Sequence, residues 1–66
     1  MKYNELERRI KKTTNSYFHH TGKRHPIWYN PDTDDFFEMS YHKNEEVATG
    51  TLNDILTKSG AKKASN

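Results

Sequence analysis

One stretch, Gly22 to Pro31, constrains the fold of this chain most, because it places a strand between two turns. Gly22 has no side chain and lets the backbone adopt conformations that close a tight turn. Pro26 fixes its own φ and drives the preceding His25 towards an extended conformation. The side chains then alternate between two faces, with His25, Ile27 and Tyr29 on one and Pro26, Trp28 and Asn30 on the other. The sequence therefore predicts a turn at 22–25 and a strand at 26–30.

Two further strands are predicted beside this one. An aromatic segment at 16–20 leads into the Gly22 turn, and the turn formers at 31–35 make a hairpin loop. A third strand is predicted at 36–41. Its alternation suits a sheet with one buried and one wet side, with Phe37 and Met39 buried and Glu38 and Ser40 in solvent.

Both ends of the chain predict helices. The first spans 4–12, with Asn4 as its N-cap and an apolar stripe of Tyr3, Leu6 and Ile10. Its basic residues, Arg8, Arg9, Lys11 and Lys12, are interpreted as a solvated surface in preference to an RNA contact. The second spans about 50–59, capped by Thr49 or Thr51 and stopped by Gly60, with Leu52, Ile55 and Leu56 buried.

A chain of 66 residues makes one domain, expected to have a core at 3–60 and a frayed polar tail at 61–66. Neither helix is stable alone, so both are expected to pack on one face of a three-stranded antiparallel sheet. The prediction is an α+β fold of order α-β-β-β-α. Only 30% of the residues are hydrophobic, which leaves little interior for a ligand cavity.

Composition also limits the chemistry and the compartment. The chain has no cysteine, so disulfides and thiolate metal sites are excluded, and no apolar run has the length of a signal peptide or membrane span. We therefore expect a cytoplasmic protein that does not bind membranes.

The net charge is only +2, but the charges are grouped. Cations gather at 8–12, at 23–24 and in the C-terminal part (Lys58, Lys62 and Lys63), and acids gather at 32–35 and 45–46. Such a divided surface suits contact with an RNA backbone on one side.

His25 is the leading candidate for chemistry. Its imidazole can exchange a proton near neutral pH, and the neighbouring Lys23 and Arg24 would attract a phosphate. From the residues alone, a solvated or hydrogen-bonded histidine is the more common interpretation of such a position. A metal site is not expected, because His19 and His20 are adjacent and should point to opposite faces, and neither His25 nor His42 completes a ligand spacing. No other cofactor is expected.

The aromatic residues divide between packing and recognition. Trp28 and Phe37 are predicted to be packing residues in so small a core. Tyr17, Tyr29 and Tyr41 are the better candidates for stacking on nucleic-acid bases.

Taken in order, these segments resemble the HicA family of bacterial toxin ribonucleases. Gly22-Lys23-Arg24-His25 is similar to the family's Gly-x-His motif, and the strand 27–31 and His42 follow it as in the family. The run Thr49 to Leu56 resembles the family's Gly-Thr-Leu-x-x-Ile-Leu helix start, and the resemblance covers about 3–60. The chain departs from the family pattern at Arg24, which lengthens the turn, and at 45–48, where relatives often carry basic residues and a proline.

The resemblance implies a double-stranded-RNA-binding-domain-like fold and a toxin endoribonuclease that cleaves mRNA without a metal. His25 would be the catalytic acid or base, Lys23 and Arg24 would stabilise charge on the phosphate, and Tyr29 and His42 would be further RNA contacts. A HicB-like antitoxin would hold the toxin inactive. Two alternatives stay open: a non-catalytic RNA-binding module with the same fold, and an adaptor whose exposed aromatic residues bind another protein.

Overall fold

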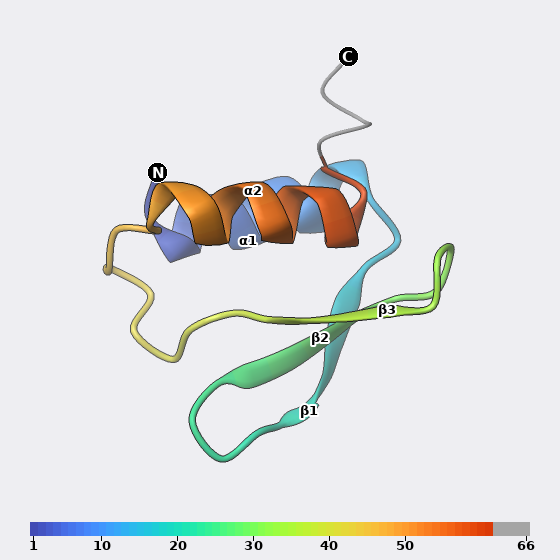
Figure 1. Cartoon of the computed structure of the whole chain (residues 1–66), viewed down its shortest axis with the longest axis horizontal. Coiled ribbons are helices and arrows are strands. Elements are labelled where there is room, and N and C mark those ends of the chain that lie inside the picture. The colour runs from blue at the N-terminus through green and yellow to red at the C-terminus, as the bar shows by residue number, and fades with distance from the viewer. Residues whose placement is uncertain (62–66) are drawn as a thin grey trace.

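The computed structural model describes residues 1–61. Their elements are α1 (Tyr3–Thr13), β1 (Tyr17–Thr21), β2 (Pro26–Asn30), β3 (Asp35–Glu38) and α2 (Thr49–Ser59). The strands form one antiparallel sheet in the order β1-β2-β3, and both helices lie on the same side of it (Figure 1). The predicted α+β arrangement is confirmed. Within 1–61, no helix is long and apolar enough to cross a bilayer.

The core lies between the sheet and the two helices. The predicted stripe of α1 is buried, and Leu52 and Leu56 of α2 pack against the core while Ile55 is inside it. Trp28 and Phe37 are each 3% exposed, which confirms them as packing residues. The buried apolar side chains are Tyr3, Leu6, Ile10, Trp28, Phe37, Met39, Val47, Ile55 and Ala61.

Ala61 corrects the expected tail. We predicted fraying from 61 onward, but Ala61 is fully buried, so this prediction is wrong at that position. The rest of the predicted tail, 62–66, lies outside the described residues, as do two of the cations assigned to the C-terminal group.

The N-cap of α1 is Lys2, so the prediction of Asn4 is wrong. The helix begins earlier because backbone carbonyls of the loop after β3 accept its first N–H groups. Tyr3 N donates to Glu45 O at 3.1 Å, and Asn4 N donates to Lys43 O at 2.9 Å. Neighbouring main chain therefore replaces a side-chain cap and ties the start of α1 to this loop.

The second helix starts at Thr49 after Ala48, with no side-chain cap, so the expected capping role of Thr49 or Thr51 is wrong. Its end matches the prediction, since Gly60 has φ of 89° and closes the helix in the left-handed region. Two buried polar side chains, one from β2 and one just before β1, connect the C-terminal end of α2 to the sheet. Asn30 Nδ2 donates to Lys58 O at 2.9 Å, and Ser16 Oγ donates to Ser59 O at 2.8 Å.

Strand β3 is shorter than predicted and ends at Glu38. The expected alternation therefore stops there, and Ser40, predicted to face solvent, is 7% exposed. Its Oγ accepts a hydrogen bond from His42 N at 3.0 Å. The buried hydroxyl thus satisfies the backbone of a turn instead of continuing the sheet.

A β-bulge in β1 corrects the expected orientation of two histidines. Phe18 pairs with Trp28 and His20 pairs with Ile27, so His19 is an extra residue without a counterpart on β2. The bulge brings the rings of His19 and His20 to the same side, with their Nδ1 atoms 2.8 Å apart. Strict alternation, which predicted opposite faces, fails because of this one added residue.

Candidate functional site

The turn between β1 and β2 carries the predicted site. The turn and the neighbouring strands form a shallow open hollow. Its lining residues are Gly22, Lys23, Arg24, His25, Ile27 and Glu38. Two hydrogen bonds hold this turn against the segment that follows β3. Tyr41 Oη donates to Gly22 O at 2.8 Å, and Met39 N donates to Pro26 O at 3.0 Å. The segment after β3 therefore holds the turn at both of its ends.

Gly22 is required for space and not for an unusual backbone angle. A Cβ built at this position would lie 2.3 Å from His25 O and 3.0 Å from Ile27 Cγ1. Only Gly60 has a positive φ among the described glycines, so the expected conformational role of Gly22 is wrong. The glycine instead lets the turn close until it nearly touches the backbone of His25.

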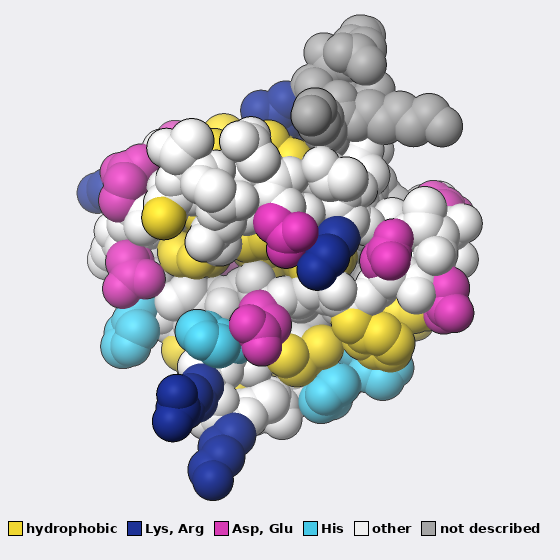
Figure 2. Space-filling model, viewed as in Figure 1, with side chains coloured by type: hydrophobic (Ala, Val, Ile, Leu, Met, Phe, Trp, Pro, Cys, Tyr) yellow, Lys and Arg dark blue, Asp and Glu magenta, His cyan; other side chains and the backbone are white. Residues whose placement is uncertain are grey.

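The two cations of the turn project into solvent. Lys23 and Arg24 are exposed, and within 1–61 neither makes an ion pair. Figure 2 shows a group of Lys and Arg side chains at the lower edge of the molecule, and Asp and Glu side chains at several places across the view. A polyanion would therefore meet two cations at the turn without first breaking an ion pair of either one.

His25 stands where the strand begins, as predicted. It is exposed and directly precedes Pro26, whose ring is buried at the start of β2. No side chain in residues 1–61 makes a hydrogen bond to the His25 imidazole. Both ring nitrogens are thus available to a ligand in the hollow.

Glu38 is a second titratable group in the hollow, and the sequence did not single it out. It pairs with Ile27 in the β2–β3 register, one position beyond the strand start, and its side chain lines the same hollow as His25. The pairing register of the β2–β3 hairpin could have located Glu38. Counting outward from the pairing of Asn30 with Asp35 brings Glu38 opposite Ile27. That count needs the loop length, and the predicted loop at 31–35 is one residue longer than the observed one, because β3 begins at Asp35.

Tyr29 and His42 do not line this hollow. Tyr29 lies further along β2 and donates a hydrogen bond from its Oη to Asp34 Oδ1 at 2.7 Å. This hydrogen bond, with smaller contributions from burial and the charge of Asp34, raises the pKa of Tyr29. His42 is exposed in the loop after β3. The structure therefore brings Lys23, Arg24 and His25 to one hollow, whose lining includes neither Tyr29 nor His42.

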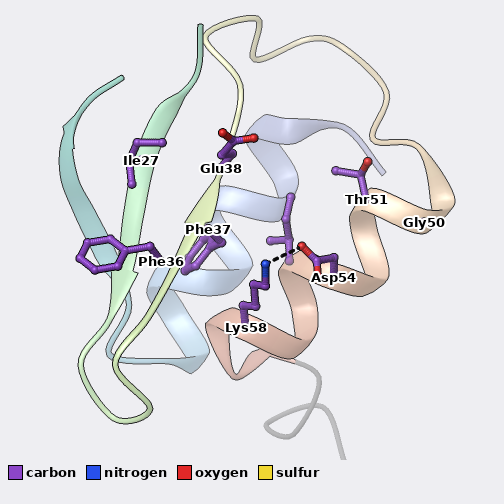
Figure 3. A pocket seen from close by; sticks show the side chains of 9 residues that line it. Ile27, Phe36, Phe37, Glu38, Gly50, Thr51, Asp54 and Lys58 are labelled. Carbon is purple, nitrogen blue, oxygen red and sulfur yellow. Dashed lines mark ion pairs between the residues drawn. The ribbon is translucent and has the colours of Figure 1, made fainter. Parts of the chain in front are cut away.

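A larger groove runs between β3 and α2 and shares Ile27 and Glu38 with the hollow (Figure 3). In this view Phe37 points towards the helices and Phe36 points away from them. On the helix side, Lys58 Nζ and Asp54 Oδ2 form an ion pair at 3.2 Å. Because Lys58 already has a carboxylate partner, we expect an anion to bind less strongly in this groove than at the turn.

Metal chemistry gains no support from the arrangement of the described side chains. Across 1–61, no three His, Asp or Glu side chains come together as a ligand set. Comparisons of this chain with protein-family models, curated proteins and solved structures give no match. The residues of the site are therefore the basis on which its function is assigned.

Proposed function

We propose that this protein is a HicA-type toxin endoribonuclease that cleaves mRNA at the hollow beside His25. The observation that carries the proposal is the single turn that presents an unpaired imidazole next to two cations without ion-pair partners in 1–61. The motif resemblance over about 3–60 supports it.

The proposed reaction uses the RNA's own 2′-hydroxyl as the nucleophile. This oxygen attacks the adjacent phosphorus while the bond to the 5′-oxygen breaks. A general base removes the proton from the 2′-hydroxyl, and a general acid gives a proton to the departing 5′-oxygen. Lys23 and Arg24 stabilise the negative charge that builds on the phosphate. No metal ion is needed for any of these steps.

One imidazole serves poorly as acid and base in the same turnover, and Glu38 supplies the second group. Both side chains line the hollow, so a phosphate held there by the cations lies within reach of an imidazole and a carboxylate. We assign the two proton transfers to this pair. The rate should then depend on pH through two groups, with loss of activity at both extremes.

A small nuclease with an exposed site needs an external inhibitor. We propose a HicB-like antitoxin that covers His25 and places carboxylates against Lys23 and Arg24, in the cytoplasm where mRNA is found. The complex would be more stable than the free toxin, because a partner that binds only the folded state raises its unfolding free energy.

The direct test compares His25→Ala with the unchanged protein on a single-stranded RNA in the presence of EDTA. We expect cleavage to fall by about 100-fold or more, since general acid–base catalysis contributes about 10²–10⁴ in rate. The melting temperature should stay the same, because His25 is exposed. A folded His25→Ala protein that cleaves at the full rate would refute the proposal.

Glu38→Gln tests the second group, with Glu45→Gln as the matched control. Glu45 is exposed and does not line the hollow. Glu38→Gln should lower cleavage and remove one limb of the pH–rate profile while RNA binding persists. Glu45→Gln should change neither. Identical profiles for Glu38→Gln and the unchanged protein would leave His25 acting without this carboxylate.

A further inference from the structure

The face of the sheet opposite the helices carries a cluster of exposed rings that packing does not explain. Tyr17, Tyr29 and Phe36 pair across the three strands and form one row on this face. The bulge in β1 adds the rings of His19 and His20. We call these five rings the aromatic face. Neither helix covers this side of the sheet (Figure 1).

The rings touch one another and remain open to solvent. Tyr29 and Phe36 have ring centroids 4.8 Å apart, and His19 lies 5.1 Å from Phe36 and 5.7 Å from Tyr29. Tyr17 and Phe36 are each 48% exposed. Only 30% of the residues are hydrophobic, and most of the large ones are needed for the core. A contiguous exposed aromatic surface on such a domain indicates a binding site.

We propose that the aromatic face binds the unpaired bases of single-stranded RNA by stacking. The five members are planar rings in contact with one another, a surface that suits the stacking of flat nucleobases. The Tyr29 Oη, held by Asp34, fixes the tilt of the central ring. Bases inside a duplex are already stacked and would not fit this surface.

Charge and continuity favour RNA as the occupant. The chain passes from His20 through Thr21 into the turn that carries Lys23 and Arg24. On the same face, the row that contains His20 continues through Ile27 to Glu38, and these last two residues line the hollow beside His25. Bases stacked on the rings would therefore lead the backbone of the same strand towards the cations and the imidazole. The aromatic face would position the substrate that the hollow cleaves.

This inference rests on the proposed RNA substrate but not on cleavage, so it is tested by binding. The probe is a short single-stranded RNA containing 2-aminopurine, whose fluorescence is quenched when the base stacks on a ring. The protein carries His25→Ala so that the probe stays intact. Phe36→Leu and Tyr17→Leu are the test variants. Phe18→Leu is the control, because Phe18 is also 48% exposed but pairs with Trp28 in the row on the helix side.

We expect each test variant to weaken binding by about 5-fold or more and to reduce the quench, since one base–aromatic stack contributes about 1–3 kcal/mol. Phe18→Leu should bind as the parent does. Equal affinity for parent and Phe36→Leu would overturn the proposal, as would an equal loss in Phe18→Leu. Self-association that Phe36→Leu abolishes without affecting RNA binding would assign the face to a second copy instead. Absence of cleavage by the unchanged protein would remove the proposed function and leave this binding result standing.

Discussion

At the scale of single residues, two glycines illustrate opposite constraints. A Cβ at Gly22 would lie 2.3 Å from a backbone oxygen, whereas a Cβ at Gly50 would meet nothing within 4 Å. At position 22 there is no space for a side chain, whereas Gly50 is an exposed residue in the first turn of α2. The same substitution should therefore have opposite effects at the two sites.

Gly22→Ala should destabilise the fold by about 1–3 kcal/mol, because the clash involves backbone that cannot rotate away. It should also lower RNA cleavage, since the displaced atom belongs to His25. Gly50→Ala should raise stability by about 0.5 kcal/mol, because alanine loses less conformational freedom in a helix. Urea unfolding of both variants checks the pair. A Gly22→Ala protein as stable as Gly50→Ala would show that the turn relaxes freely.

At the scale of elements, Glu7 connects α1 to the loop that follows β3. Its carboxylate pairs with Lys11 Nζ at 3.1 Å and with Lys43 Nζ, and the side chain is 16% exposed. Burial alone would raise the pKa of Glu7, but the hydrogen bonds and charges of Lys43 and Lys11 outweigh it and lower the pKa. The same Lys11 Nζ lies 5.7 Å from the centre of the Trp28 ring, so part of the basic side of α1 serves packing.

Glu7→Gln should reduce the unfolding free energy by about 1 kcal/mol at neutral pH. A carboxyl whose folded pKa is depressed stabilises the fold fully above its unfolded pKa and loses this effect as pH falls through the folded value. The difference between Glu7→Gln and the unchanged protein should therefore shrink from about pH 7 to about pH 3. Urea midpoints across this range measure it, with Glu45→Gln as the control. A difference that is constant with pH would exclude the ion pairs as its source.

The elements themselves were predictable, and their ends and irregularities were not. Period-two alternation gave β2 with its full bounds, and helical spacing gave the buried stripes. The cap at Lys2 was missed because carbonyls distant in sequence satisfy the first turn of α1. The bulge at His19 was missed because it follows from pairing with β2 and not from local pattern. The turn was predictable as a cluster of His25 with two cations, whereas Glu38 entered only with the strand register.

At the scale of the whole molecule, the turns at the two ends of β2 carry opposite charge. The turn before β2 carries Lys23 and Arg24, and the β2–β3 hairpin carries acids at 32–35. Lys23 and Arg24 are exposed, so an anionic strand can approach them without rearrangement of the fold. The acidic hairpin would repel the same strand and thereby favour one orientation of RNA across the sheet.

Replacing both Lys23 and Arg24 by alanine should weaken RNA binding and flatten its dependence on salt. Each lost contact with a single strand removes about 0.7 from the slope of log affinity against log salt, so the pair should remove about 1.4. Arg8→Ala with Lys12→Ala, two exposed cations of α1, is the control and should leave the slope unchanged. If the two double variants give equal slopes, positive charge acts from the whole surface and not from the turn.

The extra residue in β1 also determines how this strand tolerates changes in its length. In a regular strand, loss of one residue turns every later side chain to the other face. Here His19 has no counterpart on β2, so its deletion would join Phe18 directly to His20 and keep the pairings of both. The deletion would convert an irregular strand into a regular one and remove a single ring from the open side. A change of one residue in the length of β1 at this point therefore alters the open surface by one ring while the core stays in register.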